Sequence, residues 1–160
     1  MTRDMNKIRC AWGPSGDELY ERYHDEEWGV PVHDDRKMFE FLVLESAQAG
    51  LSWRTILGRR ENYQRLFADF DPARVALFSS SDVERLLGDA GIIRNRMKIE
   101  AAVNNAKRFL ETVTEQGSFC EYLWSFVDHH PIDEKRKSNA DIPATTSLSD
   151  MIAKDMKQRG

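Results

Sequence analysis

The feature that most constrains the fold is a segment whose apolar residues recur with the period of an α-helix. They fall three or four positions apart for more than three turns, at Ile99, Ala102, Val103, Ala106, Phe109, Leu110 and Val113. This spacing places them on one helical face that must be buried against other elements. No segment alternates apolar and polar residues as a half-buried strand does. We therefore predict an all-α fold.

Helix-capping patterns predict further helices along the rest of the chain. A helix that follows Asp34 or Asp35 should run to Gln48 and end at Gly50. We also expect helices at residues 53–67 and 148–158, and helix starts at Asp71-Pro72, Ser81-x-x-Glu84 and Ser118-x-x-Glu121. Residues 128–143 are polar and irregular. We interpret the whole chain, 1–160, as a single helical domain.

Composition restricts the classes of function. Of the 160 residues 31% are charged and 41% hydrophobic, which is typical of a soluble globular protein. No apolar run approaches the roughly 20 residues of a membrane helix, and the N-terminus lacks the apolar core of a signal peptide. We expect a cytoplasmic monomer that does not bind membranes. The net charge of −4 gives no overall attraction to nucleic acid, so DNA binding would need a local basic patch.

The candidate basic segment is GIIRNRMKIEAAVNNA, residues 91–106, which begins at a glycine turn. A short helix, the turn at Gly91 and a long helix with Arg94, Arg96 and Lys98 at its start form a candidate helix-hairpin-helix. Free backbone N–H groups and the positive end of the helix would accept a DNA phosphate. On spacing alone, an ordinary corner between helices with a solvated basic face explains the segment better.

Aromatic residues crowd the N-terminal region, at Trp12, Tyr20, Tyr23 and Trp28. Such clusters usually fill a core, and the functional alternative is a stacking pocket for a flat or cationic ligand. Cys10 and His24 are possible zinc ligands in the same region. Two donors are too few for a structural zinc site, which needs four.

A single glutamate, Glu45, interrupts the apolar stretch VLESAQAGLSW. Its helical neighbours are apolar except for Gln48, so we expect its side chain to point toward the interior or a cleft. Glu40, in contrast, has Arg36 and Lys37 beside it on the same helix. A carboxylate without a nearby cation is a candidate functional group, although a structural carboxylate that caps another helix is almost as plausible.

Together these motifs resemble the DNA-3-methyladenine glycosylase I family. The similarity runs in order through RCAWG, LYERYHDEEWGVP, FEFLVLESAQAGLSWRTIL, RENY, DAGIIRNRMKI and WSFV, and covers nearly the whole chain. It implies a DNA repair hydrolase of the helix-hairpin-helix type, acting in base excision repair. The enzyme would cut the N-glycosidic bond of 3-methyladenine in alkylated double-stranded DNA, release the base and leave an abasic site. The alternative is a truncated, non-catalytic helix-hairpin-helix module that binds DNA.

The resemblance also implies residue roles. Glu45 matches the family's base-reading glutamate and is our candidate catalytic residue. The family's pocket aromatics match Tyr20, Tyr23 and Trp53, with Trp12 and Trp28 nearby. Gly91 and its basic neighbours match the DNA-binding hairpin. The family lacks the catalytic aspartate that follows the hairpin in other glycosylases of this type, and no residue here supplies it.

A structural zinc ion is the remaining implication of the resemblance. The family binds one zinc, and its N-terminal cysteine and histidine ligands match Cys10 and His24. The family's second histidine and cysteine lie beyond a KxRG motif, which is Lys157 to Gly160 here. We therefore expect this sequence to show only two of the four zinc ligands and to lack the segment that completes the site.

Overall fold

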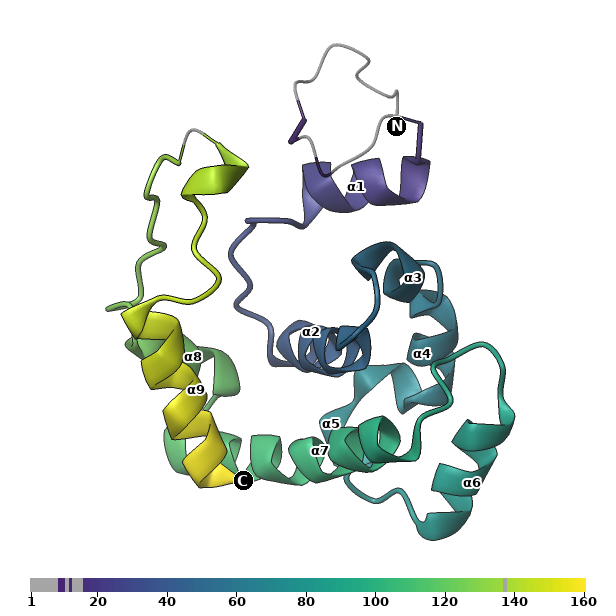
Figure 1. Cartoon of the computed structure of the whole chain (residues 1–160). Coiled ribbons are helices and arrows are strands. Elements are labelled where there is room, and N and C mark those ends of the chain that lie inside the picture. The colour runs from purple at the N-terminus through teal and green to yellow at the C-terminus, as the bar shows by residue number, and fades with distance from the viewer. Residues whose placement is uncertain (1–8, 11, 13–15, 137) are drawn as a thin grey trace.

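The computed structural model describes residues 9, 10, 12, 16–136 and 138–160, and all regular secondary structure within these residues is helical (Figure 1). The α-helices are α1 (Glu18–Glu26), α2 (Asp35–Gln48), α3 (Trp53–Leu57), α4 (Arg60–Leu66), α5 (Pro72–Val75), α6 (Ser80–Gly88), α7 (Arg96–Gln116), α8 (Phe119–Ser125) and α9 (Ser147–Arg159). Two 3-10 turns, η1 (Ala68–Phe70) and η2 (Asn139–Asp141), complete the set. The all-α prediction is confirmed.

Capping residues explain most of the helix boundaries. The Asp34 side chain accepts the N–H of Lys37 and begins α2. The Asn95 side chain accepts the N–H of Lys98 and begins α7, which ends at Gly117 with a φ of +84°. Few residues other than glycine adopt that backbone conformation, which explains why α7 ends at Gly117.

Two predicted boundaries were wrong. Residues 53–67 form two helices, α3 and α4, because the chain turns at Gly58. Helix α6 begins two residues earlier than its predicted cap, Ser81, implied. Its cap is Ser79, whose side chain accepts the N–H of Asp82 while the Asp82 carboxylate accepts the N–H of Ser79. This reciprocal pair satisfies two backbone donors and prevails over the Ser81–Glu84 pattern.

The core lies where α2, α7 and α8 meet. Phe39 of α2 packs edge-on against Phe109 of α7 with ring centroids 5.3 Å apart, and Phe119 of α8 stacks on Phe109 at 4.2 Å. The Asp35 carboxylate accepts hydrogen bonds from the Ser118 hydroxyl and the Cys120 N–H, both at 2.8 Å, which joins the start of α2 to the start of α8. Helix α2 is thereby fixed at the centre of the molecule, and α7 runs below it in the view of Figure 1.

Helix α1 lies apart from this body, above α3, at the end of an extended connection to α2 (Figure 1). The described residues of the segment, 128–136 and 138–143, carry only the short turn η2 and are otherwise irregular, as predicted. Within the described residues no helix has the length and apolar character needed to cross a membrane.

Candidate functional site

Glu45 lies near the end of α2, on the face of that helix that the core does not cover. The buried residues of α2 are Phe39, Val43, Leu44 and Ala47, whereas Glu45 is exposed. Of the two predicted positions, the interior or a cleft, the exposure of Glu45 excludes the interior, because its stripe of neighbours is only half-buried. The Glu45 side chain forms no hydrogen bond or ion pair with any described residue. Neighbouring atoms still exclude part of the solvent from the carboxylate, and this desolvation raises its pKa above the ordinary value.

Three aromatic rings contact one another in series, and the middle one, Tyr23, is near enough to Glu45 to be affected by its charge. Tyr23 of α1 is buried, and its ring lies 5.4 Å from that of Trp53 and stacks with that of Tyr20 at 6.5 Å. Desolvation, followed by the negative charge of Glu45, raises the pKa of Tyr23 to about 12, so the phenol stays neutral. The structure thus brings together Tyr20, Tyr23, Glu45 and Trp53, which we call the aromatic–carboxylate cluster.

Trp53 carries a buried donor with no acceptor. Its indole Nε1–H is shielded from solvent and makes no hydrogen bond within the described residues. A buried polar group left in this state costs roughly 1–3 kcal/mol. Such a group in a native protein calls for an explanation, and a bound ligand that accepts the hydrogen bond is one.

Trp12 and Trp28 extend the cluster outward. Trp12 contacts Tyr20 at 5.5 Å and Trp28 at 4.9 Å between ring centroids, and the Trp28 side chain is 45% exposed. The His24 ring lies beside both tryptophans, at 5.2 Å and 5.6 Å. The five aromatic residues predicted for the site therefore form one continuous series of ring contacts.

Two arginines that the sequence reading missed hold both ends of α1. The Arg60 guanidinium donates to both carboxylate oxygens of Glu27, at 2.7 and 2.8 Å, just past the end of α1. Arg54 donates to Asp17, the residue that caps the start of α1. Both arginines follow Glu45 in the chain, on α4 and α3. They are paired with residues 33 and 37 positions away, and a single sequence gives no signal for such a pairing.

Glu40 also departs from its predicted environment. It pairs with Lys37 at 2.9 Å, as expected, but its other partner is Arg60 at 2.6 Å rather than Arg36. The Glu40 side chain is only 13% exposed. Glu40 therefore belongs to the partly buried ion-pair network that supports α1, whereas Glu45 lies outside it.

The helix-hairpin-helix prediction corresponds to α6, the turn at residues 89–95, and α7. A Cβ atom at Gly91 would lie 2.7 Å from the side chain of Asn62, so only glycine fits this close approach without displacing that neighbour. Arg59 donates to the carbonyl of Ala90 at 2.7 Å, and the Ile93 N–H donates to the Tyr63 hydroxyl at 3.2 Å. The region around α4 thereby fixes the shape of the turn.

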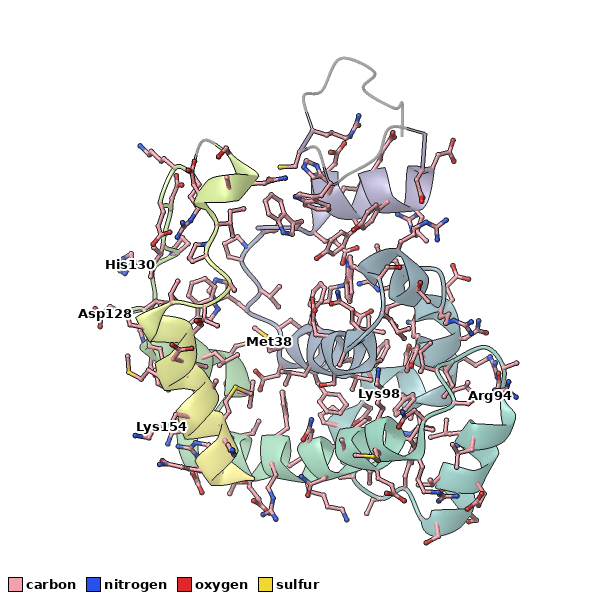
Figure 2. The ribbon with its side chains drawn as sticks, in the orientation of Figure 1. Met38, Arg94, Lys98, Asp128, His130 and Lys154 are labelled. Carbon is pink, nitrogen blue, oxygen red and sulfur yellow. The ribbon has the colours of Figure 1, made fainter. Side chains whose placement is uncertain are left out.

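The three cations predicted at the hairpin differ in their surroundings. Arg94 is exposed at the outer edge of the molecule and has no partner within the described residues (Figure 2). Arg96 is paired with Glu84 at 2.6 Å and with Glu100 at 3.6 Å. Lys98 points toward α2, where it donates to two backbone carbonyls. Arg94 is thus the cation best placed for a phosphate.

The two candidate zinc ligands lie side by side. The Cys10 N–H donates to His24 Nε2 at 3.2 Å, and His24 Nδ1 lies 2.9 Å from an Asp25 carboxylate oxygen. A hydrogen on Nδ1, donated to Asp25, leaves the Nε2 lone pair as the acceptor of the Cys10 N–H, and a metal ion would take the place of that hydrogen bond. Among the described residues no group of three or more potential ligands exists. Cys10 and His24 are therefore neighbours, and they supply two of the four donors that a tetrahedral zinc site needs.

Comparisons with known proteins agree with this arrangement. Residues 12–160 match the family described as methyladenine glycosylase. The chain is 49% identical over 152 residues to DNA-3-methyladenine glycosylase 1 of Escherichia coli (strain K12). The matched region covers 95% of this chain and 81% of the relative. The chain therefore belongs to the methyladenine glycosylase family.

Solved structures show the same similarity. A crystal structure of 3-methyladenine DNA glycosylase I matches with a TM-score of 0.92 at 49% identity, over 96% of this chain and 84% of that one. A tyrosine-to-phenylalanine variant of 3-methyladenine DNA glycosylase I, in complex with 3-methyladenine, matches with a TM-score of 0.91 at 39% identity, over 95% and 81% of the two chains. The helical glycosylase fold thus extends over nearly all of this chain.

Proposed function

We propose that this protein hydrolyses the N-glycosidic bond of 3-methyladenine in alkylated DNA, and that Glu45 recognises the base. The observation that carries the proposal is an unpaired carboxylate grouped with aromatic rings and an unpaired buried indole N–H, in a chain of the methyladenine glycosylase family. A carboxylate accepts hydrogen bonds from the exocyclic amine of adenine and favours positive charge on the ring.

The substrate's own chemistry explains why this arrangement is sufficient. Methylation at N3 makes the adenine ring cationic while it is attached to the sugar, so the base is already a good leaving group. Aromatic faces favour a cation by about 0.5–2 kcal/mol for each contact. Tyr20, Tyr23 and Trp53 would therefore select the methylated base over neutral adenine. A water molecule completes the hydrolysis, with the released base and an abasic site as products.

The reaction requires that the nucleotide leave the duplex. Unstacking a base costs a few kcal/mol, and contacts with the DNA backbone must offset this cost. The N–H groups of Ile92, Arg94, Arg96 and Met97 have no acceptor among the described residues, whereas the Lys98 N–H donates to the Asn95 side chain. They lie beside the exposed Arg94 guanidinium. We assign this hairpin as the phosphate-binding element, with Arg94 as its main cation, Arg96 as a second and Gly91 as the residue that shapes the turn.

Zinc remains part of the proposal for the N-terminal region. Cys10 and His24 would hold the ion together with two donors from outside the described cluster. The ion would have a structural role, because it would tie the segment before α1 to α1 itself through His24. The chemistry assigned to Glu45 does not depend on it.

The direct test is the release of base from DNA methylated with a radioactive methyl donor. Chromatography of the soluble fraction should show 3-methyladenine released by the wild-type chain, and much less released by the Glu45→Gln variant. Glu61→Gln is the matched control, because Glu61 is exposed on α4 and has no partner among the described residues. DNA binding without any base release would instead identify a non-catalytic helix-hairpin-helix module.

A further inference from the structure

The C-terminal end of α2 depends on a residue from another helix. The last turn of α2 contains no basic residue of its own. Its carbonyls at Ala47 and Ala49 accept hydrogen bonds from the Lys98 ammonium, at 2.8 and 2.6 Å. Helix ends leave unpaired carbonyls and carry partial negative charge, so an ammonium placed there satisfies both. Lys98 lies about 50 positions further along the chain, in the first turn of α7.

This end of α2 lies between two members of the aromatic–carboxylate cluster. Ala49 follows Glu45 by one helical turn, and Trp53 begins α3 four positions later. Gly50 has a φ of +78°, and the Leu51 N–H donates to the Gln48 carbonyl at 2.6 Å, which makes a tight turn between the two helices. Any movement of this turn would change the separation of Glu45 and Trp53.

The position of Lys98 does not suit a phosphate contact. Its side chain lies between α7 and α2, whereas Arg94 projects from the outer edge of the hairpin (Figure 2). An ammonium has three donors, and two of those of Lys98 are directed at the α2 carbonyls. A phosphate that drew the ammonium away from α2 would break both of these charge-assisted hydrogen bonds, which are stronger than neutral ones, and only the third donor is unused.

We infer that Lys98 is a positioning residue that fixes the α2–α3 turn, and with it Glu45 and Trp53, to the first turn of the DNA-binding hairpin helix. The inference rests on the proposed function of the aromatic–carboxylate cluster. It assigns to Lys98 a role in excision rather than in DNA affinity, because the ammonium is directed toward the cluster's supporting backbone. It also gives a physical link between the element that binds the phosphate and the element that reads the base.

The test compares Lys98→Met with Lys107→Met. Methionine keeps the apolar stem and removes the ammonium, and Lys107 is an exposed lysine of the same helix with no partner among the described residues. With enzyme in excess over methylated DNA, Lys98→Met should excise 3-methyladenine at least tenfold more slowly, and Lys107→Met at the wild-type rate. Lys98→Arg should recover most of the rate, since a guanidinium can also donate to both carbonyls.

DNA affinity separates this role from phosphate binding. The slope of log affinity against log salt falls in magnitude by about 0.9 for each phosphate that the protein no longer neutralises. Lys98→Met should leave this slope unchanged, whereas Arg94→Ala should reduce it. A reduced slope with a normal excision rate for Lys98→Met would make Lys98 a phosphate ligand and overturn the inference.

Two further measurements separate failure of the inference from failure of the proposed function. Hydrogen exchange of the Leu51 amide, which needs no substrate, should be faster in Lys98→Met than in the wild type, and an equal rate would show that Lys98 does not hold the turn. Urea unfolding gives the unfolded fraction of each variant. A loss of excision no larger than that fraction would show that Lys98 only stabilises the fold, and would overturn the inference. A wild-type chain that releases no base would refute the proposed function, while the exchange result would still stand.

Discussion

The Glu27–Arg60 ion pair supports a specific prediction about stability. Arg60 binds both oxygens of Glu27 and also binds Glu40, and the Arg60 side chain is only 18% exposed. Lys37 adds a further contact to Glu27 at 3.0 Å. Replacing Glu27 by glutamine keeps the shape of the side chain and removes its charge. The guanidinium of Arg60 would then lose one of its two carboxylate partners while it stays partly buried.

The magnitude follows from the pKa of Glu27. Hydrogen bonds from Arg60, followed in importance by those from Lys37, lower this pKa from 4.5 to about 2. At about 1.4 kcal/mol for each pKa unit this is on the order of 3 kcal/mol, and solvent screening of a side chain that is 22% exposed reduces it. We expect Glu27→Gln to lower the free energy of unfolding at pH 7 by ~1–3 kcal/mol.

The same pKa shift sets the dependence on pH. Because the pKa of Glu27 is lower in the folded than in the unfolded protein, its contribution is present above about pH 4.5 and is lost as the pH falls toward about 2. The difference in stability between wild type and Glu27→Gln should therefore shrink over this interval. Urea unfolding at a series of pH values measures this difference in the free energy of unfolding. Glu61→Gln is the control and should change stability by less than about 0.5 kcal/mol. A Glu27→Gln variant as stable as the wild type at pH 7 would refute the assignment of the ion pair as the support of α1.

Two other predictions concern DNA and zinc. Alanine at Arg94 or Arg96 should weaken binding to all DNA sequences and reduce the salt dependence of that binding, with the larger effect at Arg94. Binding of free 3-methyladenine should be kept. An unchanged salt slope in filter-binding titrations would show that the hairpin does not bind DNA phosphates. A polypeptide of residues 1–160 should lose zinc to a chelator, because Cys10 and His24 supply two of the four donors and the described residues contain no group of three potential ligands. One equivalent of zinc retained after dialysis, measured by atomic absorption, would contradict this.

Local sequence patterns predicted the helices well because capping is a local interaction. Asp34, Asn95 and Ser118 each bond to a backbone N–H three positions ahead, so the signal lies within one turn. The failures have the same origin. Two overlapping Ser-x-x-acid patterns, Ser79–Asp82 and Ser81–Glu84, lie near residue 80, and the sequence alone does not show which of them forms the capping box. Gly58 divides residues 53–67 into two helices although the apolar spacing continues through it.

The sequence predicted which residues make up the candidate site, but not the contacts that hold these residues in place. Helical spacing and the family resemblance together selected Glu45 and its aromatic neighbours, and the structure brings these residues together, while their roles in binding remain predictions. The contacts that hold the cluster join residues far apart in the chain. Arg60 pairs with Glu27, and Lys98 with the carbonyl of Ala47, at separations of 33 and 51 residues. In both pairs, neither the residue types nor their spacing in the sequence identifies the partner.

The exposure of Glu45 shows why a helical wheel could not choose between the interior and a cleft. The wheel identifies residues that share a face, but not whether that face meets a core or a solvent-filled groove. Half-buried neighbours on α2 gave the appearance of an interior stripe. The raised pKa of Glu45 has desolvation as its only cause, with no cation near enough to lower it. An ionised Glu45 therefore opposes folding slightly, as is common for a residue retained for function.

The affinity of the Glu45→Gln variant for free 3-methyladenine tests most directly whether Glu45 reads the base. Glutamine keeps the size and hydrogen-bonding capacity of the side chain and removes the charge, so calorimetric titration should show a loss of ~1–3 kcal/mol, or roughly 5- to 150-fold in Kd. The variant should be at least as stable as the wild type at pH 7, because it removes an unpaired, partly desolvated charge. Unchanged affinity, or a variant that unfolds, would instead make Glu45 a structural carboxylate and contradict its assignment as the residue that reads the base.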